Sequence, residues 1–196
     1  MKSIKVYFDY KSPFSYLAME EIFKIQADFN IELIWMPWIL NLSETYGDIG
    51  NRNSKQWNKV KNLYQQVRRV ANKRGIIVKG PQKIYNGEAA ALGSLYAIKH
   101  NKFKTYNDKV FIKFFKRELD IDSLDGISKV LEQCEVNSNE FVSFCKTEGE
   151  SLLLEIRKSA SDDRVFGVPS LVYQQELFWG SESFPFLRDI LQGRRV

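Results

Sequence analysis

The first 38 residues contain a strand, a helix and a second strand in immediate succession. Residues 4–10 are rich in β-branched and aromatic side chains, which favours a strand, and Ser12 and Pro13 follow as a typical N-cap and first residue of a helix. Apolar residues then recur at helical spacing to about residue 29, and residues 31–38 form a second apolar run. Two strands joined by one helix pair in parallel with a right-handed crossover, so this segment predicts a layered α/β sheet.

The middle of the chain has a different pattern, with helical spacing and no convincing strand between residues 41 and 164. Helices are predicted at residues 55–73, 88–100, 106–117, 124–134 and 140–157. Strand character returns at Ser170–Tyr173 and Glu176–Trp179, and the two glutamines between them match a two-residue hairpin. A terminal helix after residues 180–183 completes the order β-α-β, helices, β-β-α. We therefore expect a sheet domain of residues 1–40 and 165–196, with residues 41–164 as an all-helical insertion.

The positive charge of the chain is concentrated in one segment. Of the 29 Lys and Arg residues, ten lie between residues 49 and 87, where there is no acidic residue, and the rest of the chain carries 19 against 24. Such a segment either steers an anion towards the protein or forms a solvated helix face. A nucleic acid is not expected as the anion, because the sequence has no nucleic-acid-binding motif and no basic tail.

The remaining composition indicates a soluble protein of a reducing compartment. No run approaches the roughly 20 apolar residues of a membrane span, and no signal peptide is expected. The two cysteines, Cys134 and Cys145, have no metal-ligand spacing and no second pair with which to build a disulfide framework. We therefore expect buried, unreactive cysteines in helices, no metal site and a cytoplasmic location.

The predicted order of strands and helices is that of thioredoxin-like folds, in which the loop after the first strand holds the active site. Oxidoreductases of this fold carry C-x-x-C there, at a helix N-terminus. This chain has Ser12-Pro13-Phe14-Ser15 instead. Pro169 stands just before the third strand, where the fold places a cis-proline that faces the active loop, although the isomer cannot be read from sequence.

Two stretches resemble a known family. VYFDYKSPFSYLA at residues 6–18 and FGVPSLVYQQELFWGSESFPFL at residues 166–187 are similar to the kappa-class glutathione transferases and the bacterial 2-hydroxychromene-2-carboxylate isomerases, which are relatives of DsbA. VKNLYQQVRR at residues 60–69 is a weaker match. The resemblance spans nearly the whole chain and implies a DsbA-like thioredoxin fold and glutathione as the cofactor. It also implies a small aromatic carboxylate or other electrophile as the substrate, and a homodimer.

The resemblance implies roles for particular residues. In the family, a serine aligned with Ser12 hydrogen-bonds the glutathione sulfur, and the residue before the proline, here Val168, pairs its backbone with the cysteinyl part. A Ser-Asp pair that binds the γ-glutamyl part lines up with Ser181 and Glu182, and an Asn and a Lys from the insertion complete the site. The implied glutathione-binding residues are Ser12, Pro13, Phe14, Asn53, Lys61, Val168, Pro169, Ser181 and Glu182, with Ser12 also catalytic and Asn51 as the alternative to Asn53.

These residues also have ordinary structural explanations. Ser12 suits an N-cap, Pro169 a strand entry, Ser181 and Glu182 a capping pair, and Lys61 a solvated helix face. The family context is what favours a site at the loops that converge in this fold.

Other residues are weaker candidates. Trp38 and Trp57 either pack or line an aromatic substrate pocket. His100, at the end of a predicted helix, is not expected to act as a base.

The leading hypothesis is a glutathione-dependent isomerase of the 2-hydroxychromene-2-carboxylate type. By resemblance, a glutathione thiolate adds to a conjugated carbon of an aromatic keto acid, the former double bond rotates, and elimination regenerates glutathione. A hydroxyl donor and the positive end of a helix both stabilise a thiolate, which is a physical reason for a serine at this position. The alternatives are a kappa-class-like glutathione transferase or peroxidase, and a redox-inactive thioredoxin-fold module that binds an extended peptide.

Overall fold

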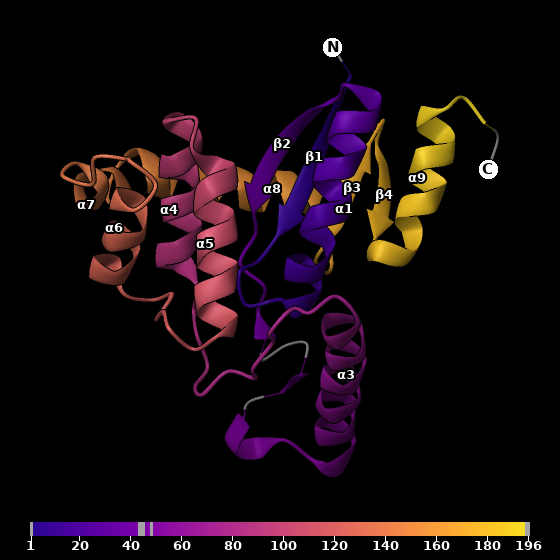
Figure 1. Cartoon of the computed structure of the whole chain (residues 1–196), viewed down its shortest axis with the longest axis horizontal. Coiled ribbons are helices and arrows are strands. Elements are labelled where there is room, and N and C mark those ends of the chain that lie inside the picture. The colour runs from indigo at the N-terminus through magenta and orange to yellow at the C-terminus, as the bar shows by residue number, and fades with distance from the viewer. Residues whose placement is uncertain (1, 43–45, 48, 195–196) are drawn as a thin grey trace.

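The computed structural model describes residues 2–42, 46–47 and 49–194, and these residues form a mixed sheet covered by helices. The strands are β1 (Ser3–Phe8), β2 (Glu32–Pro37), β3 (Ser170–Tyr173) and β4 (Glu176–Trp179), in the spatial order β2-β1-β3-β4. β1 pairs in parallel with β2 and antiparallel with β3, and β3 and β4 form an antiparallel hairpin. The predicted α/β class and the β-α-β…β-β-α order are confirmed (Figure 1).

β1 is at the centre of the sheet and is covered on both faces. Val6, Tyr7 and Phe8 are fully buried, as expected for an apolar strand between two neighbours. Pro37 lacks an N–H to donate, and it lies opposite Phe8 in the edge strand β2, where a missing ladder bond is tolerated. The carboxyl end of β1 leads directly into the loop that carries Ser12.

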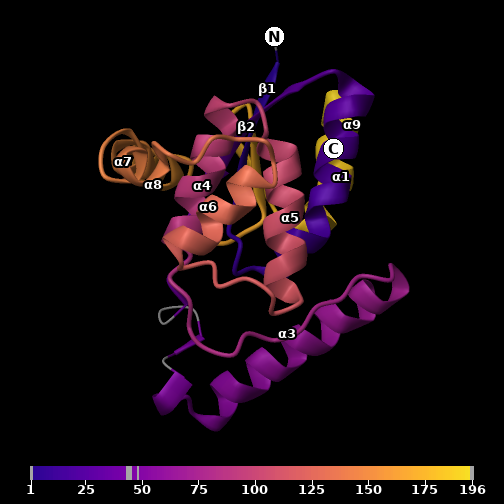
Figure 2. The ribbon, with the colours of Figure 1, turned by 60° about the vertical axis from the view of Figure 1, so that its left-hand side comes forward.

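The helices fall into groups around the sheet. Their bounds are α1 (Pro13–Phe29), α3 (Ser54–Lys73), α4 (Glu88–Lys99), α5 (Phe103–Phe115), α6 (Leu124–Glu132), α7 (Phe141–Cys145), α8 (Glu148–Asp162) and α9 (Phe184–Leu191), with 3-10 turns η1 (Ile49–Asn51) and η2 (Ser181–Ser183). α1 and α9 lie side by side, joined by ion pairs of 2.7 Å from Arg188 to Glu21 and Asp28 (Figure 2). α8 crosses the other face, where Tyr7 of β1 donates a hydrogen bond to Asp163.

α4 to α7 pack beyond the β2 edge of the sheet, and one hydrophobic core connects them to the strands (Figure 1). Phe103 of α5 packs against Phe8 and Trp35, with ring centroids 5.8 and 4.3 Å apart. The segments expected as a sheet domain and as a helical insertion therefore share a single core.

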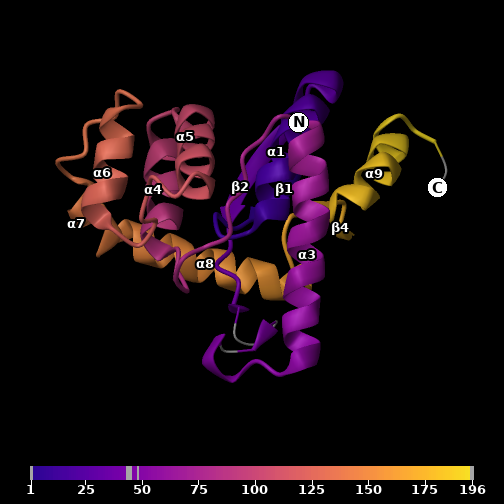
Figure 3. The same cartoon turned by 60° about the horizontal axis from the view of Figure 1, so that its bottom comes forward.

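α3 is placed differently from the other helices. It projects away from the sheet at the bottom of Figure 1, and Figure 3 shows its whole length. Its buried residues Val67 and Ala71 pack with Leu17 of α1 in a small cluster of their own. Most of its surface is exposed, so the basic segment forms a solvated helix over most of its length.

The predicted helix at residues 140–157 is wrong as one element. The structure has α7 and α8 there, separated by Lys146 and by Thr147, whose φ and ψ of −128° and −99° are not helical. Gly149 then packs closely against Leu92 and Phe144, an approach that a larger residue would block. The apolar residues of both helices face the same core, so their spacing hid the break. The break also shortens the preceding prediction, because α6 ends at Glu132 rather than at Cys134.

The hairpin between β3 and β4 is confirmed. Gln174 and Gln175 have φ of 50° and 67°, so the turn has both central residues in the left-handed region, as a type I′ turn requires. Among the described residues, no helix has both the length and the apolar composition needed to span a bilayer.

Candidate functional site

A cavity of about 590 Å³ opens beside the N-terminus of α1. Its walls come from the β1–α1 loop, the segment after β2, the N-terminal half of α3, residues 80–85 and the loop that precedes β3. Ser12, Pro13, Phe14 and Val168, four of the expected site residues, line it together. Segments that are far apart in the sequence therefore meet around the start of one helix, where backbone N–H groups and the helix dipole favour an anion.

Ser12 is the N-cap of α1, and its hydroxyl has a donor to spare. Its Oγ accepts a hydrogen bond from the backbone N–H of Ser15 at 3.1 Å, and its own N–H is donated to the Asp9 carbonyl at 3.0 Å. The residue is only 9% exposed and lines the cavity. Among the described residues, no acceptor takes the Ser12 hydroxyl proton. The hydroxyl can therefore donate to a ligand atom in the cavity while it continues to cap the helix.

Asp9 and Lys11 form a buried charge pair under this loop. The Asp9 carboxylate accepts hydrogen bonds of 2.8 Å from the backbone N–H groups of Lys11 and Leu40, and the Lys11 ammonium lies 3.4 Å from it. The ammonium also donates to the carbonyls of Leu40, at 3.0 Å, and Asn86, at 2.8 Å. Burial raises the pKa of Asp9 above its usual value, and Lys11 opposes that rise. Lys11 thus joins three chain segments at the cavity wall.

The loop before β3 supplies an unpaired peptide edge. The Val168–Pro169 peptide bond is cis, and the buried Val168 lines the cavity. Within the described part of the chain, neither the N–H nor the carbonyl of Val168 has a hydrogen-bond partner. Pro169 is buried, does not line the cavity, and accepts a hydrogen bond from the Gly180 N–H at 2.9 Å. The free edge of Val168 suits an extended peptide ligand.

The remaining expected residues lie outside the cavity wall. Ser181 and Glu182 are exposed in η2, immediately after the Gly180 that is bonded to Pro169. Asn53 caps α3 and exchanges hydrogen bonds of 2.9 Å with Gln56, so its side chain is already used. Lys61 is exposed on α3. Asn51, the alternative to Asn53, is exposed in η1.

An aromatic and cationic wall faces Ser12, and most of it was not predicted. Trp57 lines the cavity, as one of the two possibilities for it allowed, whereas Trp38 packs against the core. The added aromatic residues are Tyr46, Tyr64, Tyr85, Phe114, Phe166 and Trp179, and the added cations are Lys11, Arg52, Lys59 and Lys83. Arg52, Lys59 and Lys83 belong to the basic segment, which was the sequence signal for them. The aromatic residues have no local signal, because folding alone brings them together.

The chain brings no thiol of its own to this cavity. Cys134 is buried in the turn after α6, and Cys145 is buried at the end of α7. Burial raises the pKa of both thiols, that of Cys145 to about 11. His100 caps the C-terminus of α4 and packs against Tyr96, away from the cavity wall.

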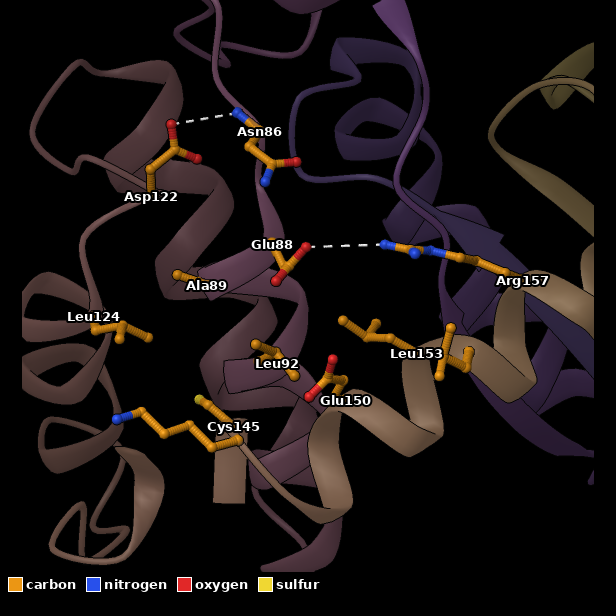
Figure 4. Close-up of a pocket in the computed structure, with 12 residues that line it drawn as sticks. Asn86, Glu88, Ala89, Leu92, Asp122, Leu124, Cys145, Glu150, Leu153 and Arg157 are labelled. Atoms are coloured by element: carbon orange, nitrogen blue, oxygen red, sulfur yellow. Dashed lines mark hydrogen bonds and ion pairs between the residues drawn. The ribbon is translucent and has the colours of Figure 1, made fainter. Parts of the chain in front are cut away.

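Cys145 instead lines a second cavity, of about 480 Å³, among α4, α7 and α8 (Figure 4). Glu88 and Arg157 face each other there as an ion pair of 3.8 Å, and Asp122 accepts a hydrogen bond from the Asn86 N–H. None of the expected site residues lines it. We therefore place the candidate site at the Ser12 cavity.

Comparison with known proteins agrees with this architecture. The family model described as the DSBA-like thioredoxin domain matches residues 3–192. The 2-hydroxychromene-2-carboxylate isomerase of Pseudomonas putida is 26% identical over 195 residues, covering 97% of this chain and 94% of the relative. The proteins of the same name from Pseudomonas sp. (strain C18) and Sphingobium xenophagum are 25% and 22% identical over 98% and 97% of this chain, and over 92% and 98% of the relatives.

Solved structures show the same fold. A structure of 2-hydroxychromene-2-carboxylate isomerase superposes with a TM-score of 0.79 at 24% identity and covers 97% of this chain and 95% of its own. A putative protein disulfide isomerase from Nitrosomonas europaea has a TM-score of 0.77 at 15% identity, with 98% of each chain covered. With this fold, this match along nearly its whole length and the serine in the position of the redox cysteine, the chain belongs to the DSBA-like thioredoxin domain family.

Proposed function

We propose that the protein is a glutathione-dependent isomerase of the 2-hydroxychromene-2-carboxylate type. The observation that carries the proposal is the Ser12 hydroxyl, which lines the cavity at the start of α1 and has no acceptor for its proton among the described residues. A donor placed there stabilises a thiolate over a thiol. Both cysteines of the chain lie elsewhere, so the sulfur must come from another molecule.

The residues around the cavity fit glutathione. Ser12 and the N-terminus of α1 would hold the sulfur, and the unpaired backbone of Val168 would pair with the cysteinyl part. Ser181 and Glu182, next to the Pro169 loop, would hold the γ-glutamyl end. When bound, glutathione would supply a nucleophilic thiol for a conjugated carbon of the substrate.

The chain itself provides three kinds of stabilisation around that sulfur. The Ser12 hydroxyl donates a hydrogen bond, and no acidic residue lies in the first turn of α1 to oppose an anion there. Lys11 compensates the charge of Asp9 under the loop. Aromatic rings such as Trp57 and Tyr85 would contact a planar substrate and exclude water, and the basic segment would attract its carboxylate.

Glutathione binding and the role of Ser12 can be tested together. Isothermal titration of the parent with reduced glutathione should show binding, and ultraviolet titration should show a lowered thiol pKa for the bound molecule. Ser12→Ala should bind glutathione within a few-fold of the parent but return that pKa towards its free value. Turnover of 2-hydroxychromene-2-carboxylate should fall by roughly 100-fold to 1,000-fold, the usual effect of removing one donor to a developing anion.

Ser123→Ala is the matched control. Ser123 caps α6 through the same kind of bond, from its Oγ to the Gly126 N–H at 3.0 Å, and lines neither cavity. Both variants lose an N-cap worth about 1 kcal/mol, so only an effect specific to Ser12 reports on the site. Absence of glutathione binding by the parent would refute the cofactor, and an unchanged thiol pKa in Ser12→Ala would refute the role of Ser12. Conjugation of a halogenated aromatic without isomerisation would indicate a transferase instead.

A further inference from the structure

The cations of the cavity wall differ in how they are bound. The ammonium of Lys11 is surrounded by Asp9 and two carbonyls, and Lys83 forms ion pairs with Asp120 at 2.7 Å and with Asp122 at 4.0 Å. Lys59 lies over the ring of Tyr46, 5.0 Å from its centroid. These side chains are therefore occupied by the protein itself.

Arg52 has a rigid mount and an unused end. Its Nε donates to the carbonyls of Tyr46 and Gly47, both at 3.0 Å, and its guanidinium carbon lies 5.1 Å from the centroid of the Trp57 ring. Within the described ranges, no carboxylate pairs with it, and no partner is present for its Nη1 and Nη2 groups. A guanidinium held in this way presents two parallel N–H donors, which match the two oxygens of a carboxylate.

Tyr64 lies beside Arg52 on the same wall. Its hydroxyl has no hydrogen-bond partner among the described residues, although the side chain is largely buried and lines the cavity. Burial raises the pKa of Tyr64 to about 12, while the nearby Arg52 acts in the opposite direction. The phenol therefore keeps its proton at neutral pH and can donate it in a hydrogen bond.

We infer that Arg52 and Tyr64 form the subsite that recognises the carboxylate of the substrate, and that Arg52 makes the cavity selective for planar carboxylic acids over their neutral analogues. Arg52 would bind the two carboxylate oxygens, Tyr64 would donate a further hydrogen bond, and the aromatic wall would contact the planar body. This inference deepens the proposed function and rests on it for the identity of the site. It assigns Arg52 and Tyr64 to substrate recognition, while Ser12 and Val168 remain with glutathione.

The selectivity can be measured by binding alone, with trans-cinnamate and its neutral analogue trans-cinnamamide as probes. Isothermal titration of the full chain should show at least roughly tenfold tighter binding of the acid, as expected for charged hydrogen bonds. Arg52→Gln should remove this preference, Arg52→Lys should keep part of it, and Tyr64→Phe should reduce it by a smaller factor. Arg69→Gln, which removes one exposed positive charge from α3 outside the cavity wall, should keep the preference.

The same titrations separate a substrate carboxylate from a glutathione carboxylate. Arg52→Gln should bind glutathione like the parent. If it lost affinity for glutathione and kept the preference for cinnamate, the subsite would belong to the cofactor and the inference would be overturned, with the proposed function intact. If the parent preferred cinnamate through Arg52 but did not bind glutathione, the proposed function would fail and the assignment of Arg52 would stand. Equal binding of acid and amide by the parent would overturn the inference, and Arg52→Lys and Tyr64→Phe keep it testable should Arg52→Gln not fold.

Discussion

Asp9 and Lys11 show how single side chains hold the site in place. Both side chains are almost inaccessible to solvent, at 4% and 6% exposure, so each charge depends on its partner. The Lys11 ammonium also holds the Asn86 carbonyl, and the segment that ends there, residues 80–85, contributes to the cavity wall. The charge pair beside the catalytic loop is therefore a structural connection between loops.

Lys11→Met should destabilise the protein, and the loss should depend on pH. Removal of one partner of a buried ion pair costs roughly 3–5 kcal/mol. Without Lys11 the pKa of Asp9, already raised by burial, should rise further. A carboxyl with a higher pKa in the folded state takes up its proton on folding, so the deficit should shrink as the pH falls from about 7 to about 5. Urea unfolding of parent and variant at both pH values measures this.

Two further variants serve as controls for this prediction. Asp9→Asn combined with Lys11→Met should recover part of the lost stability, because no buried charge then remains unpaired. Lys24→Met breaks a surface pair with Glu20 in α1 and should change stability little at either pH. An equal deficit of Lys11→Met at the two pH values would show that lost packing, rather than the unpaired Asp9, causes it.

Among the strands, the β3–β4 turn is the place where the sequence is least suited to its backbone. Gln174 and Gln175 both adopt positive φ, which costs a residue with a Cβ roughly 1 kcal/mol. Type I′ turns favour Asn-Gly for this reason. The turn lies at the far end of the hairpin from Trp179, the β4 residue that lines the cavity.

Gln175→Gly should therefore stabilise the protein without changing the site. We expect a gain of about 0.5–1 kcal/mol, seen as a higher melting temperature, with glutathione affinity unchanged. Gln175→Ala removes the same polar atoms but keeps the Cβ, so it should give no gain. A similar rise in melting temperature for both variants would mean that side-chain effects, not the backbone conformation, are responsible.

The strands and the first helix could be predicted from sequence because their signals are local. Residues 4–10 and the pair Ser12-Pro13 specify a strand end and a helix start within a few positions, and β1 and α1 begin and end close to where those signals lie. The break between α7 and α8 has no such signal, since the apolar spacing continues through Thr147. Only the packing of Gly149 against neighbouring helices reveals it.

The candidate site divides in the same way. Ser12, Pro13, Phe14 and Val168 line the cavity and lie in motifs that could be recognised in the sequence. The aromatic and cationic wall depends on where residues 46–64 and 80–85 are held, and contacts between distant segments, such as that of Lys11 with Asn86, decide this position. Composition shows that this region is basic, but it does not show which of its residues face the cavity.

The chain as one body is held together by aromatic packing between the sheet side and the helical segment. Phe111 of α5 lies at this junction: its ring is 4.8 Å from that of Tyr10 in the β1–α1 loop and 5.2 Å from that of Tyr16 in α1. Phe111 is completely buried, and the hydrophobic core continues from the strands through α5 to α4, α6 and α7. Residues 41–164 therefore have no separate core on which to fold alone.

It follows that the sheet and the helices of the insertion should unfold together. Far-ultraviolet circular dichroism reports mainly on the helices, and tryptophan fluorescence reports on Trp35 and Trp179 in β2 and β4. In urea the two signals should give one transition, because domains of this size with a continuous core unfold cooperatively. Phe111→Ala should lower the midpoint of both signals equally and cost about 3–5 kcal/mol. The neighbouring Ile112→Ala, at a 41% exposed position, should change either midpoint little. If Phe111→Ala moved the dichroism transition and left the fluorescence transition in place, the insertion would be an independent domain, and the cavity would lie between two bodies that can separate.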